Sequence, residues 1–296
     1  MTATVTAEKK KAKQRTGLHR TWETAKRVFK TPSAKLGGIL FLVFLFCALF
    51  AELIAPYGPY EMDYVNMYAT PSWKHLCGTD SLGRDIFSRL IYGARWSLTL
   101  GIVADVVGQL GGVVVGSIAG YFGGKTDTYI MRFMDIWQAI PSMLLTIIMS
   151  AVLGPGFGNT ILALAISAVP RGARMTRGMI LAERGKEYLE AAQSINCSSS
   201  VIMFSHLLPN VISPTLVAAT MQVGGTITMA ASLSYLGLGV QPPTPEWGAM
   251  LSEGTAVLTS YPHMILFPGI VIGICILSIN LMGDGLRDAL DPKLRH

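Results

Sequence analysis

The chain has 296 residues, a formal net charge of +6 and a mean hydropathy of +0.45. Of its residues, 51% are hydrophobic and only 14% are charged. Because soluble globular domains carry about 25% charged residues, this composition excludes an ordinary soluble protein and indicates one polytopic membrane domain. The four cysteines include no CxxC pair, which argues against a metal or redox centre built on thiols.

The first 35 residues differ from the rest of the chain in charge. Residues 1–35 hold ten of the 24 Lys and Arg, without a zinc-finger or RNA-binding pattern. We therefore expect a cytoplasmic basic tail attracted to anionic lipid rather than a nucleic-acid-binding segment. Within this tail, Trp22, Val28 and Phe29 suit a short surface helix over residues 21–30.

The remaining sequence, residues 36–296, is predicted to form an all-α domain with six transmembrane helices. Each expected span is long enough to cross about 30 Å of hydrocarbon. Pro141 lies inside the third span, and the fourth is expected to break near Pro170. The segment between the first span and about Arg95 is expected to be a loop. The six spans cover approximately residues 36–54, 97–122, 130–153, 159–180, 207–236 and 263–282.

The second span carries a regular glycine pattern. Its glycines recur every four residues, at Gly108, Gly112, Gly116 and Gly120. Residues at this spacing share one helix face, so the pattern produces a smooth strip on which a second helix can approach closely. We predict that the strip is a helix-packing surface.

The distribution of positive charge predicts the orientation in the membrane. With six spans, both termini lie on the same side of the membrane. If the arginines after Pro170 are assigned to the following loop, 20 of the 24 Lys and Arg fall on that side. The opposite side holds the other four, Lys74, Arg84, Arg89 and Arg95. The positive-inside rule therefore predicts that both termini and a loop over residues 183–206 are cytoplasmic.

The 183–206 loop contains a short helix-forming segment. Glu187 and Glu190 lie in its first turn, where acidic side chains favour the positive end of a helix, and Asn196 is expected to end it. An acidic helix suits an anionic membrane surface poorly, so a protein cleft is the better partner. The residues of its expected apolar face, at helical spacing, are Tyr188, Ala191, Ala192 and Ile195.

Asp105 is a carboxylate inside the second predicted span. A charged group within the membrane is a functional candidate because its burial is costly, yet no basic partner is evident in a neighbouring span. Three roles remain open: lining a translocation path, contacting a second subunit, or relaying protons. Met143 and Met221 are further candidates for the path, with gap filling as the alternative.

One match to a nucleotide-binding pattern is rejected. Residues 119–126, AGYFGGKT, fit a relaxed phosphate-loop pattern with Ala in place of the first glycine. A phosphate loop follows a strand, whereas this segment leaves a membrane helix. The sequence also lacks GxSxG, and its histidines are not spaced as metal ligands. We predict that the chain is not an enzyme and binds no metal or cofactor.

Longer blocks are more specific than these patterns. They are residues 75–95 (HLCGTDSLGRDIFSRLIYGAR), 241–248 (QPPTPEWG) and 280–292 (NLMGDGLRDALDP), together with Glu-Ala-Ala at 190–192 followed by Leu-Pro at 208–209. In this order they resemble the dipeptide/oligopeptide/nickel permease family of ABC importers, specifically its C-type subunit. That family usually has glycine where this chain has Asn196. Asparagine tolerates the left-handed conformation, so the turn is expected to survive.

The resemblance implies a type I ABC importer permease in the cell inner or plasma membrane. It implies a heterodimeric pore with a B-type permease, two ATPase subunits that hold ATP and Mg, and an extracytoplasmic substrate-binding protein. Arg84, Pro245 and Trp247 become candidate contacts for the binding protein, with a structural turn or an interfacial helix as the alternative. The implied ATPase-coupling residues are Glu187, Glu190, Ala191, Ala192, Ile195, Asn196 and Pro209.

The expected cargo is a dipeptide or oligopeptide. Nickel or another metal chelate is the first alternative, because similar permeases carry both classes. A secondary transporter driven by an ion gradient through Asp105 is the second. Such carriers often show inverted repeats and several charges within their spans, and neither is evident in this sequence.

Overall fold

The computed structural model describes residues 31–290. Within this range the regular secondary structure is helical, apart from one isolated β-bridge between Thr79 and Asp85, and loops connect the helices. Most of the basic tail, including the expected surface helix over residues 21–30, lies outside the described residues. The long helices are α2 (Pro32–Leu49), α4 (Ile86–Phe122), α7 (Phe157–Arg184), α10 (Leu208–Tyr235) and α12 (His263–Leu290). The short ones are α3 (Ala51–Ile54), η1 (Tyr64–Asn66), α5 (Gly124–Ala139), α6 (Ser142–Leu153), α8 (Glu187–Ser194), α9 (Ser199–Val201), η2 (Ile202–Leu207) and α11 (Trp247–Thr255).

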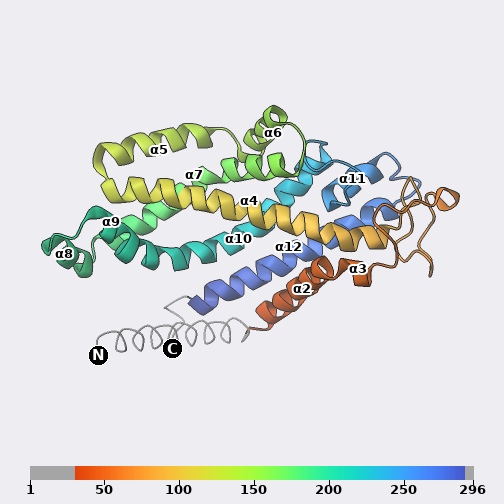
Figure 1. Cartoon of the computed structure of the whole chain (residues 1–296), viewed down its shortest axis with the longest axis horizontal. Helices are drawn as coiled ribbons and strands as arrows, with labels where there is room; N and C mark the ends of the chain where they lie inside the picture. The colour runs from red at the N-terminus through yellow and green to blue at the C-terminus, as the bar shows by residue number, and fades with distance from the viewer. Residues whose placement is uncertain (1–30, 291–296) are drawn as a thin grey trace, which may run out of the picture.

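The long helices form an elongated bundle with two distinct ends (Figure 1). At one end, α8 and α9 extend beyond the other helices, and we call this the α8 end. At the other end lie α3, α11 and the connections around them, and we call this the α11 end. The α8 loop and the connections around α11 therefore lie on opposite sides of the bundle.

Length and composition mark four described helices as able to cross a membrane: α2, α4, α10 and α12. A fifth crossing results if α5 and α6 are counted as one bent span. The remaining predicted span is α7, which has 28 residues and packs along α4 but is less apolar. Its arginines, which the sequence analysis assigned to the following loop, are inside the helix: Arg171, Arg174, Arg177 and Arg184.

The predicted boundaries of the first and second spans are wrong. The helix expected to begin at residue 97 begins at Ile86, because Asp85 caps it by accepting a hydrogen bond from the backbone N–H of Ser88 at 2.8 Å. The first span begins earlier than expected, with Pro32 in its first turn, and it is interrupted at Phe50 before α3.

The interior prolines also behave differently from the prediction. The third span is not straight, since α5 and α6 meet at Pro141 with a bend of 86°. In contrast, α7 continues through Pro170 to Arg184, so the predicted break is wrong. Proline removes one helical hydrogen bond, and the packing of α7 against α4 tolerates that loss. The last helix also continues past residue 282 to Leu290.

The glycine strip of α4 packs against α7, as predicted. A methyl group added at Gly112 would lie 2.6 Å from the backbone of Gly172, so the two helices touch through their backbones. The other three strip glycines, Gly108, Gly116 and Gly120, likewise face α7 residues. We call this contact the α4–α7 seam. Because the α4 glycines add no side chains to the contact, dispersion and close backbone approach stabilise the pair, as in other membrane helices.

Substitution in the seam tests this packing. We expect Gly112→Ala to lower the thermal midpoint of the purified protein, because overpacking costs about 1–3 kcal/mol. The control is Gly178→Ala on α7, where an added methyl group meets nothing within 4 Å. The measurement is fluorescence-detected size exclusion after heating, and equal midpoints for the two variants would contradict the seam.

Candidate functional site

The α8 loop is built on a small apolar core at the α8 end. Leu189 and Ala192 of α8 are buried against Ile180 of α7 and against Leu207 and Val211, at the start of α10. This core attaches α8 to both long helices that flank it. The predicted apolar face is therefore only partly right, because the sequence analysis assigned Ala192 to the docking surface and overlooked Leu189.

The outward side of α8 carries the other candidate residues. Glu187, Glu190 and Ala191 are exposed, and Ile195 is 77% exposed. Asn196 adopts φ 58°, the left-handed conformation expected at this position. The coupling candidates on α8 thus form an acidic and apolar outward surface, except Ala192, which faces inward. Ile195 and Asn196 follow directly after this helix.

Polar contacts fix α8 to its neighbours. The hydroxyl of Tyr188 donates to Glu183 at 2.9 Å and accepts from Asn210 at 3.1 Å, which links α7, α8 and α10. Burial, followed by the hydrogen bond to Glu183, raises the pKa of Tyr188, so its hydroxyl keeps its proton. Pro209 is exposed in the first turn of α10, directly after the π-helical turn η2.

At the α11 end, Arg84, a predicted contact for the binding protein, is buried together with Arg89. Arg84 and Arg89 are 2% and 1% exposed, and both contact the carboxylate of Asp80 and that of Glu253 on α11. Their contacts to Glu253 measure 3.0 and 2.8 Å. We call Asp80, Arg84, Arg89 and Glu253 the outer ion cluster. It joins the first outer loop and α4 to α11, so the predicted contact of Arg84 with a binding protein is wrong.

Trp247 is also interior. It is fully buried, its indole N–H donates to the carbonyl of Leu90 at 2.9 Å, and its ring meets Phe44 edge to face at 5.8 Å. The predicted contact of Trp247 with a partner is therefore wrong, and its role is to hold α11 against α4 and α2. Pro245, just before it, is buried and borders a pocket.

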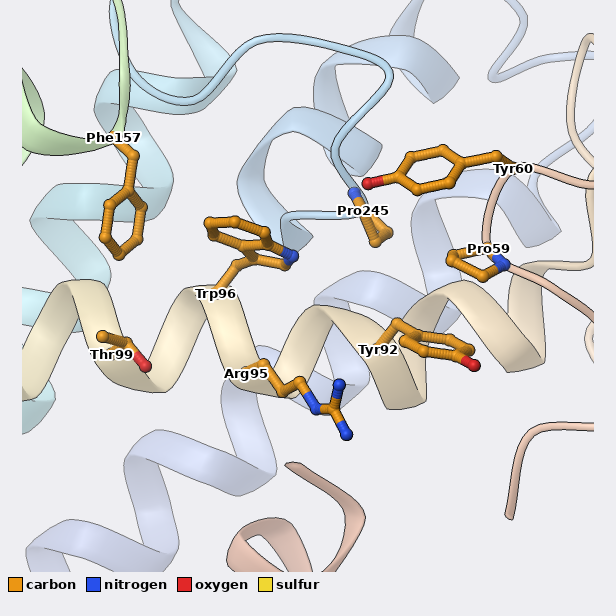
Figure 2. Close-up of a pocket in the computed structure, with 8 residues that line it drawn as sticks. All are labelled: Pro59, Tyr60, Tyr92, Arg95, Trp96, Thr99, Phe157 and Pro245. Carbon is orange, nitrogen blue, oxygen red and sulfur yellow. The ribbon is translucent and has the colours of Figure 1, made fainter. Parts of the chain in front are cut away.

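That pocket, of about 470 Å³, was not predicted (Figure 2). Trp96 and Phe157 meet edge to face at 5.2 Å, while the Arg95 side chain extends away from them and donates to the carbonyl of Leu49 and to Glu52 on α2 and α3 (Figure 2). The aromatic lining of this pocket is typical of membrane proteins at the level of the membrane–water interface. The lining residues are Pro59, Tyr60, Tyr92, Arg95, Trp96, Thr99, Phe157 and Pro245.

In the middle of the bundle, Asp105 has neighbours that the sequence analysis did not identify. It is 2% exposed and accepts a hydrogen bond from Thr226 of α10 at 3.4 Å. Arg171 of α7 donates to Gln222 of α10 at 2.7 Å, one helical turn before Thr226. The structure therefore brings a basic residue of α7 to the same part of the bundle as Asp105, whereas the sequence analysis assigned Arg171 to a loop.

The two methionine candidates lie elsewhere. Met143 of α6 borders a second cavity of about 400 Å³ between α6, α10, α11 and α12. Met221 packs beneath Gly283 of α12. Their positions provide no shared site with Asp105.

Comparison with known proteins gives two matching families. Residues 112–296 match the family described as "Binding-protein-dependent transport system inner membrane component". Residues 20–71 match "N-terminal TM domain of oligopeptide transport permease C". The first match covers more than half of the chain.

Two relatives are similar over most of their length. The di/tripeptide transport system permease protein DppC of Pseudomonas aeruginosa (strain UCBPP-PA14) is 44% identical over 268 residues, which is 88% of each chain. The glutathione transport system permease protein GsiD of Escherichia coli O6:K15:H31 (strain 536 / UPEC) is 45% identical over 282 residues, which is 95% of this chain and 92% of that protein.

Two solved structures share the fold. The MetNI methionine ABC transporter, in an inward-facing conformation, superposes with a TM-score of 0.58 and 19% identity, covering 69% of this chain and 97% of that chain. An amino acid ABC transporter gives a TM-score of 0.51 and 15% identity, covering 67% and 92%. At these identities, the two similarities show a shared fold and nothing further.

The outer ion cluster yields a stability prediction. We expect Arg89→Met to destabilise the protein by about 3–5 kcal/mol, because it leaves Asp80 and Glu253 with less compensation in a buried site. Lys74→Met is the matched control: its surface pair with Asp63 spans 3.6 Å and its loss should cost about 0–1 kcal/mol. Thermal midpoints in detergent measure both effects, and a similar small shift for each would argue against the buried cluster.

Proposed function

Because this chain belongs to the family of binding-protein-dependent transport system inner membrane components, we propose that it forms half of a membrane path for peptides. It is the permease subunit of an ABC importer, and in that family ATP is hydrolysed by partner subunits. The chain itself binds neither nucleotide nor metal in this proposal. The phosphate-loop-like segment supports this, since Gly123 ends α4 and α5 follows directly, with no strand before it.

The peptide cargo is proposed from two observations. Two relatives at 44% and 45% identity are named for the transport of di/tripeptides and of glutathione, which are all small peptides. Residues 20–71 in addition match a domain named for oligopeptide transport. The proposed assembly pairs this chain with a second permease of the B type, two ATPase subunits and an extracytoplasmic binding protein.

The observation that carries the mechanism is the α8 loop. Its outward surface combines two glutamates with Ile195, which is 77% exposed. The helix α8 itself extends beyond the long helices (Figure 1). An exposed isoleucine within an acidic surface suits a protein cleft better than water or anionic lipid. Its inner side is packed on both α7 and α10, so a push on α8 is transmitted to both helices.

In this mechanism, ATP closes the pair of ATPase subunits and moves α8 as a rigid arm. The permease then alternates between inward-open and outward-open states, because each nucleotide state binds one arrangement of α8 better than the other. The α8 end is cytoplasmic and the α11 end faces outward, as the positive charge of the loops predicts.

A substitution on the outward side of α8 tests the docking surface. We expect Ala191→Arg to abolish ATP-driven dipeptide uptake and to reduce co-purification of the ATPase subunits about tenfold or more, because a long cation would occupy the docking surface. The thermal midpoint should stay unchanged, since Ala191 is exposed. Uptake is measured in proteoliposomes that contain the complete transporter.

Two controls accompany this test. Ala192→Arg should unfold the α8 loop instead, because Ala192 is buried against α7 and α10. Val65→Arg places the same charge on an exposed residue at the α11 end and should leave co-purification intact. Normal uptake by Ala191→Arg would exclude docking at this surface.

Thiol labelling tests the orientation. In a Cys47→Ala variant, we expect a membrane-impermeant maleimide to label Cys197 in inside-out vesicles but not in right-side-out vesicles. Cys77 at the α11 end should not compete, because it is buried and burial, followed by Asp85, raises the pKa of its thiol to about 11. Trp73→Cys, at a position 97% exposed in the outer loop, is the opposite-side control. Labelling of Cys197 from outside would reverse the proposed orientation.

A further inference from the structure

A polar cluster lies midway along three long helices. It joins Asp105 of α4, Arg171 of α7, and Gln222 and Thr226 of α10. Arg171 and Gln222 are each the fifteenth residue of a 28-residue helix, and Asp105 is the twentieth of 37. All of these groups are therefore far from both helix ends, at the depth where the hydrocarbon of a membrane would be.

Arg171 is exposed on the surface of the chain despite this depth. A guanidinium that faces hydrocarbon is strongly unfavourable, so charged residues within membranes face a protein interior or a water-filled path. The exposed side of Arg171 therefore cannot be a lipid surface. It faces the region that this chain encloses together with its partner subunit.

The buried side of the cluster supplies the counter-charge. Asp105 is 2% exposed and its Oδ2 has no hydrogen-bond partner among the described residues. Its Oδ1 accepts from Thr226, which lies one turn of α10 after Gln222, the residue that accepts from Arg171. The neighbouring Gln109 also has a buried side-chain oxygen, Oε1, without a partner in the described part of the chain. Gly172 permits this arrangement, because a methyl group there would lie 3.0 Å from that oxygen.

The donors of Arg171 are only partly used. A guanidinium has five N–H donors in a planar fork, and the described residues engage it through one hydrogen bond, from Nη1 to Gln222 at 2.7 Å. The rest of the fork matches the geometry of a carboxylate, which it can bind with two parallel hydrogen bonds.

We propose that Arg171 binds a free carboxylate of the cargo midway through the membrane. The inference rests on the proposed function and adds a chemical class to it: substrates with a carboxylate, such as the C-terminus of a peptide. Asp105 is a positioning residue that partly offsets the charge of Arg171 from about one helical turn away, while Gln222 holds the guanidinium. This offset suits transport, because a path site must bind its cargo weakly enough to release it.

The test uses the complete transporter in proteoliposomes, with a labelled dipeptide as cargo. We expect Arg171→Gln to lower uptake about tenfold or more, the loss typical of a charge-assisted hydrogen bond. Arg171→Lys should retain part of the uptake, since it keeps the charge but not the fork. Arg174→Gln is the matched control, because Arg174 lies one turn away on α7 and pairs with Asp135 at 2.9 Å.

Charge rescue separates a binding role from a structural one. In a background without the native cysteines, Arg171→Cys should regain uptake after modification with a cationic thiosulfonate and stay inactive with an anionic one. Asp105→Asn should lower the KM for loaded binding protein together with the maximal rate, because an uncompensated Arg171 holds the carboxylate longer. A purely structural loss would lower the maximal rate alone.

The outcomes distinguish this inference from the function on which it rests. If the unmodified transporter showed no ATP-dependent dipeptide uptake, the proposed function itself would be wrong. Normal uptake by Arg171→Gln, or failure of both thiosulfonates to react with Arg171→Cys, would overturn the carboxylate site and leave the peptide importer standing.

Discussion

The backbone contact between α4 and α7 is the constraint on which the other features of this chain depend. Four glycines on α4 add no side chains of their own to the contact, and Gly112 meets Gly172 at backbone distance. In a membrane, where burial of apolar surface gives little drive for association, such close contact is the main source of helix pairing. The seam fixes the rotation of α7, which brings Arg171 against Gln222 of α10 and places Ile180 under α8.

Features encoded within short stretches could be predicted from the sequence. The family, confirmed by the matches, is recognisable from three blocks of consecutive residues, and the all-α fold follows from the apolar segments. The glycine strip needs only a four-residue repeat, and the left-handed turn at Asn196 needs only the chemistry of one residue. Each of these signals lies within a few residues and requires no knowledge of the partner segment.

Features that depend on distant partners were predicted wrongly. Arg89 looks like a surface residue until Glu253, 164 positions away, is placed against it. Trp247 is interior for the same reason, since its hydrogen bond reaches back 157 positions to Leu90. Arg171 was assigned to a loop because charged residues usually mark the end of a span. In the structure, α7 packs along α4 and continues past Pro170, so Arg171 lies midway along the helix.

The two proposed working parts are mechanically connected through this packing. The seam joins α4 and α7 at close distance, with only α7 side chains reaching the glycines, so we expect these two helices to move as one body. In contrast, α10 contacts them through side chains, and the hydrogen bond from Arg171 to Gln222 crosses that joint. Because α8 is packed on both α7 and α10, its displacement changes their relative position. The carboxylate site proposed at Arg171 lies on the joint, so the movement that drives transport also changes how the site holds its cargo.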